Sequence, residues 1–317
     1  MWRRRDDPTA GVSTVALRLM AASLLSFWRR GTTTERVAYV VGVLLIVSGL
    51  GHLAILVMNG GPWDGPVSLR KPTTFGLSFG LTLITIVWVS AFLALRGGTR
   101  AALVGAFTFA CVIETVLVTM QAWRGVPSHF NVETTLDALV ARALAVGGLT
   151  LVVITVSLTA IAFRNNATVP RSLLTAIRVG FMALLGAQVV GAAMIARGMK
   201  LALNGDPLAA YASGGMLKPA HAVMMHGVLV LPALAWILSF VDWSERRRLE
   251  IVLLAASGYV LVSGVITLAN LDELFGLHQA PLLKAALLAI GAASFGAAGA
   301  VTLIGVAQSD GVDGVRR

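Results

Sequence analysis

The chain has 317 residues, of which 57% are hydrophobic and 13% are charged, and its formal net charge is +10. A soluble domain typically carries about 25% charged residues, so this composition excludes a soluble globular domain and indicates a polytopic membrane protein. The single cysteine, Cys111, excludes a disulfide framework and a metal site built from several thiolates.

Residues 1–35 are basic at both ends and have an apolar middle from Val12 to Trp28. Arg18 interrupts this middle and no small-residue cleavage site follows, which argues against a signal peptide. We expect a cytoplasmic tail that contains an amphipathic helix lying in the membrane interface. A disordered basic tail is the alternative.

Eight apolar runs follow, each long enough to cross the hydrocarbon core of a bilayer, which takes about 20 residues. They cover residues 37–58, 73–95, 101–123, 136–163, 173–195, 220–240, 251–271 and 282–306. Their connections are short, and their polar residues do not alternate as in a membrane barrel. The predicted fold class is therefore all-α: an integral membrane bundle of eight transmembrane helices over residues 36–306, with a cytoplasmic tail at 307–317.

Arginine residues concentrate in the tails and loops on one side of this predicted bundle. Because positive residues favour the cytoplasmic side, we expect both termini in the cytoplasm and the protein in a bacterial inner membrane. The net charge is then topological, and it gives no support for a nucleic-acid partner. All five histidines and all four lysines fall on the opposite, outer side, so the outer half is the predicted functional half.

Short motifs recur at matching places in the first four and the last four predicted helices. Arg70-Lys71-Pro72 opens the second run and Leu217-Lys218-Pro219 opens the sixth, and Gly80 and Gly227 follow at similar distances. These motifs suggest a parallel internal repeat of residues 36–165 and 172–306. Ligand sites often lie where such repeats meet. Chance recurrence of Lys-Pro pairs is the alternative.

The leading hypothesis is permease-like binding or transport of a small anionic solute from the outer side. Candidate ligand-binding residues are the outer cations and their polar neighbours: Arg70, Lys71, Arg124, His129, Asn131, Arg142, Lys218, His221 and Lys284. Three acids could couple protons or form ion pairs: Glu114, Asp137 and Asp272. A charge inside the bundle should be paired, so we expect Glu114 to pair with Arg142 or Lys284.

A membrane redox protein is the main alternative. His52 and His226 both lie about 10 Å below the predicted outer boundary, given the rise of a helix, so they could ligate haem b. Met224 and Met225 beside His226 could instead bind copper(I), which favours thioether and imidazole ligands.

Two further classes remain open. A metal-dependent intramembrane hydrolase would draw its ligands from His129, His221, His278 and Asp272. No nucleophile motif accompanies these residues, so an enzyme is the less favoured class. In a non-catalytic scaffold the same polar groups would serve helix packing. The substrate and the oligomeric state do not follow from the sequence.

One outer loop resembles a family signature. Gln121-Ala122-Trp123-Arg124-Gly125, followed by Ser128-His129-Phe130-Asn131, is similar to a pattern found in an uncharacterised family of polytopic bacterial membrane proteins. The resemblance covers this loop alone. It implies a site on the outer face and no named activity.

Overall fold

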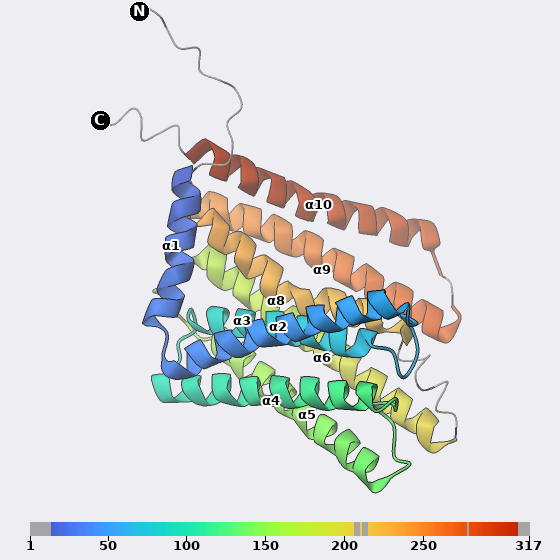
Figure 1. Ribbon diagram of the computed structural model, residues 1–317. Coiled ribbons are helices and arrows are strands. Elements are labelled where there is room, and N and C mark those ends of the chain that lie inside the picture. The colour runs from blue at the N-terminus through green and yellow to red at the C-terminus, as the bar shows by residue number, and fades with distance from the viewer. Residues whose placement is uncertain (1–13, 206–209, 211–214, 278, 310–317) are drawn as a thin grey trace, which may run out of the picture.

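The computed structural model of the protein describes residues 14–205, 210, 215–277 and 279–309. Over these residues the fold is all-α, as the sequence predicts, and contains nine helices (Figure 1). They are α1 (Thr14–Arg30), α2 (Thr33–Asn59), α3 (Arg70–Ser90), α4 (Gly97–Trp123), α5 (Thr135–Ala162), α6 (Arg171–Leu203), α8 (Lys218–Leu238), α9 (Glu245–Phe275) and α10 (Pro281–Gln308).

Eight of these helices, α2–α6 and α8–α10, are long and apolar enough to cross a membrane. The protein is therefore a multi-span integral membrane protein, and the predicted bundle is confirmed. Some boundaries differ from the prediction. The helix α3 ends at Ser90 rather than at residue 95, because the amides of Ala91 and Phe92 donate to carbonyls three residues back, which tightens the chain out of the helix.

The spans alternate in direction between two ends of the bundle. The helices α2, α4, α6 and α9 begin at one end, which we call the terminal end, and α3, α5, α8 and α10 begin at the opposite, distal end (Figure 1). At the terminal end Thr32 and Glu35 form a capping box that starts α2. At the distal end the hydroxyl of Thr134 accepts a hydrogen bond from the amide of Asp137 and starts α5.

The helix α1 lies across the terminal end rather than along the bundle (Figure 1). Ala16 and Met20 pack against Val306 of α10, and the ring of Phe27 contacts the edge of Phe92 with a centroid distance of 5.7 Å. The predicted helix in the N-terminal segment is thus present. Its location in the membrane interface stays a prediction.

Glycines allow the closest helix pairs to approach backbone to backbone. The helix α2 packs most extensively against α3, and α6 packs most extensively against α8. A Cβ atom at Gly80 of α3 would lie 2.5 Å from the carbonyl oxygen of Gly42 in α2. A Cβ atom at Gly180 of α6 would lie 2.9 Å from the carbonyl oxygen of Gly227 in α8. Each crossing therefore requires glycine on the contact surface.

The helix α3 lies near the centre of the bundle. Half of the residues in its most apolar 18-residue stretch are buried, against 17% in the corresponding stretch of α10. The reason is that α3 packs against α2, α4 and α8, whereas α10 packs mainly against α9. The contact between α3 and α8 joins the first four spans to the last four, as the more extensive contact between α5 and α6 also does.

Candidate functional site

A cavity of about 550 Å³ opens at the distal end, where α3 and α8 begin and α9 ends. We call it the distal pocket. Its polar and aromatic lining comes from both halves of the chain: Trp63, Asp64, Arg70, Lys218, Asn270 and Glu273. Two cavities in the described part of the chain adjoin the contact between α3 and α8, and the distal pocket is the larger of them.

The loop before α3 holds Arg70 in place. The hydroxyl of Ser68 donates to the carbonyl oxygen of Trp63 at 2.9 Å and accepts a hydrogen bond from the amide of Arg70 at 3.1 Å. The Nε atom of Arg70 donates to the same Trp63 carbonyl at 2.8 Å, while Asp64 lies 3.9 Å away. Because Asp64 is exposed, it neutralises Arg70 only weakly.

Three of the predicted cations converge at this pocket. Arg70 and Lys218 line it, and Lys71 lies within electrostatic reach of both. The N-termini of α3 and α8 also point to this end, and the positive ends of their dipoles add to the potential. Asn270 supports α8 by accepting a hydrogen bond from the first-turn amide of Ala220 at 2.9 Å.

Arg124 and Asp137 join the end of α4 to the start of α5, and they do not line the distal pocket. Asp137 is 2% exposed and accepts hydrogen bonds from Arg124 at 2.7 Å, from Gln121 at 2.9 Å and from the hydroxyl of Thr134 at 2.7 Å. This arrangement satisfies the carboxylate fully, which indicates a structural tie.

The loop between α4 and α5 places His129 beside Ser128 and Lys71. Its Nδ1 atom lies 2.9 Å from the hydroxyl of Ser128, which is also 3.4 Å from the ammonium nitrogen of Lys71. Burial, aided by the positive charge of Lys71, lowers the pKa of His129 to about 3. Asn131 in the same loop is buried, and its Nδ2 atom has no hydrogen-bond partner.

Acid should destabilise the protein through His129. The folded protein keeps this ring neutral down to about pH 3, whereas an exposed histidine takes up a proton below about pH 6.5. Unfolding therefore takes up a proton, and stability falls as the pH falls from about 6.5 toward 3. Melting temperatures measured in detergent across this window should decline less steeply for His129→Asn than for the parent. Lys200→Gln is a control in which another basic side chain at the same end is replaced, and its melting temperature should depend on pH as that of the parent does. If the melting temperatures of the parent and His129→Asn fell equally with pH, His129 would not be the source of the acid sensitivity.

The predicted partner of Glu114 is wrong. Lys284 forms an ion pair with Asp272, and Arg142 is exposed on the outside of α5. Glu114 is 4% exposed, lies against Gly147 and has no hydrogen-bond partner at its Oε1 atom. The sequence could not reveal this, because it does not give the rotation of each helix about its axis.

His52 and His226, the proposed haem pair, have different neighbours. The Nδ1 atom of His52 donates to the carbonyl oxygen of Ser48 at 2.7 Å, and its Nε2 atom accepts a hydrogen bond from the indole of Trp123 at 3.0 Å. Both nitrogens are thus used, so His52 does not fit an axial haem ligand. His226 instead faces α3, and its Nδ1 atom donates to the carbonyl oxygen of Ala222 at 2.6 Å.

The other candidate metal ligands are also dispersed. Met224 packs near Gly186 of α6, whereas Met225 faces α3. The Nδ1 atom of His221 donates to the carbonyl oxygen of Ala187 at 2.7 Å. His278 lies outside the described residues. Among the residues that the structure describes, no three histidines, cysteines or acids form a group that could hold a metal ion.

Sequence reasoning missed an ion pair at the terminal end. Arg100 of α4 lies 2.6 Å from Glu35 of α2, and Glu35 is 4% exposed. The signal was available, since Thr32 followed three residues later by Glu35 before an apolar run is a capping box. This pair ties the starts of α2 and α4 together.

The fold and the composition define the class of protein, an integral membrane protein with a bundle of eight long apolar helices. Comparison with protein-family models, with curated proteins and with solved structures finds no match to this chain. Any more specific function therefore rests on the geometry of the distal pocket.

Proposed function

We propose that this protein binds a small solute with an anionic group in the distal pocket and acts as a permease for it. The observation that carries the proposal is the pocket itself. Its volume of about 550 Å³ is within the range of roughly 300–1,000 Å³ that small-molecule sites occupy. Arg70 and Lys218 line it from opposite halves of the chain, so a bound anion would bridge the two halves.

The acids of the pocket refine the expected substrate. Asp64 and Glu273 share the lining with Arg70 and Lys218. A solute with two negative charges would meet repulsion from these carboxylates, whereas a zwitterion could place its anionic group near the cations and its ammonium group near Glu273. An amino-acid-like zwitterion is therefore the preferred substrate class.

We include an internal duplication in the proposal, and two sets of corresponding contacts support it. Arg124 and Asp137 join the distal ends of α4 and α5, while Asp272 and Lys284 join the distal ends of α9 and α10 with the signs reversed. The glycine crossings of α2 with α3 and of α6 with α8 also correspond. Parallel repeats of this kind occur in transporters, whose sites lie where the repeats meet. The predicted topology would place the distal pocket on the outer side.

Neutral substitutions in the pocket test the proposal. In the purified protein at low ionic strength, zwitterionic or anionic solutes should raise the melting temperature, and cationic solutes should not. Arg70→Gln and Lys218→Gln should each weaken binding by about tenfold or more, since each removes a charge-assisted hydrogen bond. Uptake of the same solute into proteoliposomes should fall in parallel.

Lys200→Gln is the matched control, because Lys200 is an exposed cation at the distal end of α6 that does not line the pocket. It should bind the solute as the parent does. A panel in which no anionic or zwitterionic solute stabilises the parent would overturn the proposal. Equal binding by the parent and Arg70→Gln would overturn it as well.

A further inference from the structure

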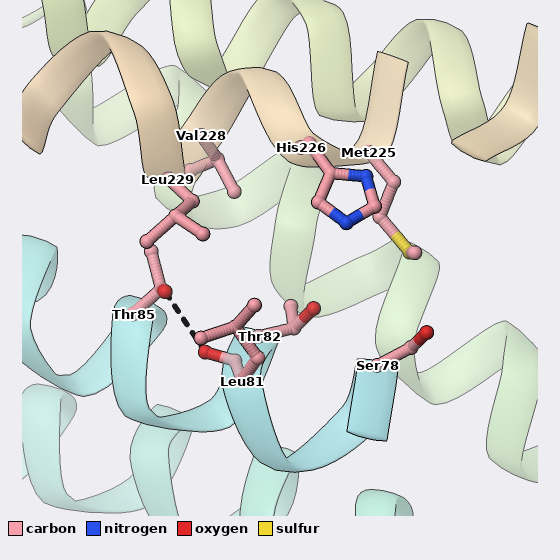
Figure 2. A pocket seen from close by; sticks show the side chains of 8 residues that line it. All are labelled: Ser78, Leu81, Thr82, Thr85, Met225, His226, Val228 and Leu229. Atoms are coloured by element: carbon pink, nitrogen blue, oxygen red, sulfur yellow. Dashed lines mark hydrogen bonds between the residues drawn. The ribbon is translucent and has the colours of Figure 1, made fainter. Parts of the chain in front are cut away.

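A second, smaller cavity lies deeper along the contact between α3 and α8 (Figure 2). Its volume of about 10 Å³ is room for about one water molecule. Ser78, Thr82 and Thr85 of α3 face Met225 and His226 of α8 across it (Figure 2). We call the surface between α3 and α8 that runs through this cavity the seam.

The two cavities follow each other along the same two helices. In α3 the chain passes Arg70 in the distal pocket and then Ser78 in the smaller cavity. In α8 it passes Lys218 and then His226. Each step is about 12 Å along the helix axis, given a rise of about 1.5 Å per residue. Polar groups therefore lie at two depths along these helices, at the distal pocket and about 12 Å deeper in the bundle.

The polar groups of the smaller cavity favour water in the seam. His226 uses its Nδ1 atom within α8, and its ring lies opposite the hydroxyl groups of Ser78 and Thr82 (Figure 2). Thr85 satisfies its hydroxyl by donating to the carbonyl oxygen of Leu81 at 2.8 Å. His226 is exposed at the surface of the bundle, so in a membrane its second imidazole nitrogen would lose hydration at considerable cost, and a water molecule in the cavity would supply its hydrogen bond.

Aromatic side chains connect α3 and α8 nearer the terminal end. Five rings form an unbroken series of contacts with centroid distances of 5.7, 5.7, 6.0 and 4.9 Å: Phe27, Phe92, Trp88, Trp236 and Phe240. We call them the aromatic array. The contact between Trp88 of α3 and Trp236 of α8 crosses the seam, and Phe27 joins the array from α1.

Two features distinguish the array within the hydrophobic core to which Trp88 belongs. The spacing Trp-x-x-x-Phe occurs at the end of both α3 and α8, so the two halves contribute matching aromatic pairs. In addition, Trp88 is 9% exposed and its indole nitrogen has no hydrogen-bond partner. Buried tryptophans usually find such a partner, so this N–H is an unused donor within the array.

We infer that the seam between α3 and α8 is the route of the solute, open from the distal pocket to Ser78 and His226 and closed beyond them by the aromatic array. The inference rests on the proposed function for the identity of the solute, but not for the accessibility of the seam. Charged residues select the solute at the mouth, hydroxyl and imidazole groups hydrate it midway, and the array separates it from the terminal side.

Cysteine accessibility tests the route directly. The only native cysteine, Cys111, is fully buried, so Cys111→Ser gives a background without reactive thiols. Ser78→Cys places a thiol in the seam, and Gly51→Cys places one at a similar depth on the open face of α2. A charged, membrane-impermeant methanethiosulfonate reacts with the thiolate, forms a mixed disulfide and releases sulfinate. In proteoliposomes it should modify Ser78→Cys from the distal side at least about tenfold faster than Gly51→Cys, because thiolates form in water and not in lipid.

The aromatic array predicts a difference between the two sides. Reagent applied from the terminal side should leave Ser78→Cys unmodified until Trp88→Ala is added, which should open access. If Trp88→Ala does not fold, Phe240→Ala at the end of the array provides the same test. Equal rates for Ser78→Cys and Gly51→Cys, or modification from the terminal side with the array intact, would overturn the inference.

The outcome separates the route from the proposed function. If Ser78→Cys is modified from the distal side but no solute binds the distal pocket in the melting-temperature assay, the seam is a water-filled path and the solute proposal is wrong. If solute binding depends on Arg70 but the thiol of Ser78→Cys is modified no faster than that of Gly51→Cys, the distal pocket is a binding site and the proposed route is wrong.

Discussion

Replacing Gly49 with leucine is expected to disrupt the packing of α2 against α3. A Cβ atom at Gly49 would lie 2.8 Å from the amide nitrogen of Leu77 and 2.9 Å from the carbonyl oxygen of Thr73. Both atoms belong to the backbone of α3, so no side chain can move aside. Overpacking typically costs about 1–3 kcal/mol, and a backbone clash between two spans should reach or exceed the upper value. Loss of monodisperse protein in detergent and a lower melting temperature would report it.

Gly51 in the same helix is the matched control. A Cβ atom at Gly51 would have no neighbouring atom within 4 Å, so Gly51→Leu only adds an apolar side chain to an open face. It should fold and melt as the parent does. If Gly49→Leu were as stable as Gly51→Leu, α2 and α3 would not approach each other in the membrane as closely as described.

Replacing Glu114 with methionine is expected to stabilise the protein. The carboxyl group is 4% exposed and its Oε1 atom has no hydrogen-bond partner. The amide of Gly148 donates to the carboxyl group, but leaving one buried polar atom without a partner still costs about 1–3 kcal/mol, so an apolar side chain of similar length should recover part of that amount. A higher melting temperature of Glu114→Met in detergent is the expected result.

Glu35 provides a control with the opposite expected sign. It is also 4% exposed, but it pairs with Arg100 and caps α2. Glu35→Met should therefore lower the melting temperature, because it removes the carboxylate that neutralises Arg100 and leaves only the hydrogen bond to Ser90. If Glu114→Met lowered the melting temperature as Glu35→Met does, the carboxyl group of Glu114 would have its full set of hydrogen-bond partners in the membrane.

The same variant tests the predicted proton-coupling role of Glu114. An acid that is retained at a cost to stability is a candidate functional group. If Glu114→Met is more stable than the parent but transports the solute without its pH dependence, Glu114 couples protons. If uptake and its pH dependence are unchanged, the carboxyl group has no part in transport.

Part of the candidate site could be predicted from the sequence and part could not. Arg70, Lys71 and Lys218 open their helices beside a proline, so their place at one end of the bundle follows from chain order. Whether they meet depends on which spans are neighbours. The structure brings them together at the distal pocket, whereas it places Arg142 on the outside and pairs Lys284 with Asp272.

The sequence by itself determined the class of this protein. Long apolar runs must satisfy their backbone hydrogen bonds within lipid, and only helices do so within a single segment, so an all-α bundle follows from composition and length. Only the tertiary structure decided what the polar residues do. Helix adjacency and rotation depend on contacts between distant residues, such as Gly42 with Gly80 or Trp88 with Trp236. These contacts place a charged pocket at the distal end of the seam, join aromatic rings at its other end, and leave Glu114 buried with an unpartnered oxygen.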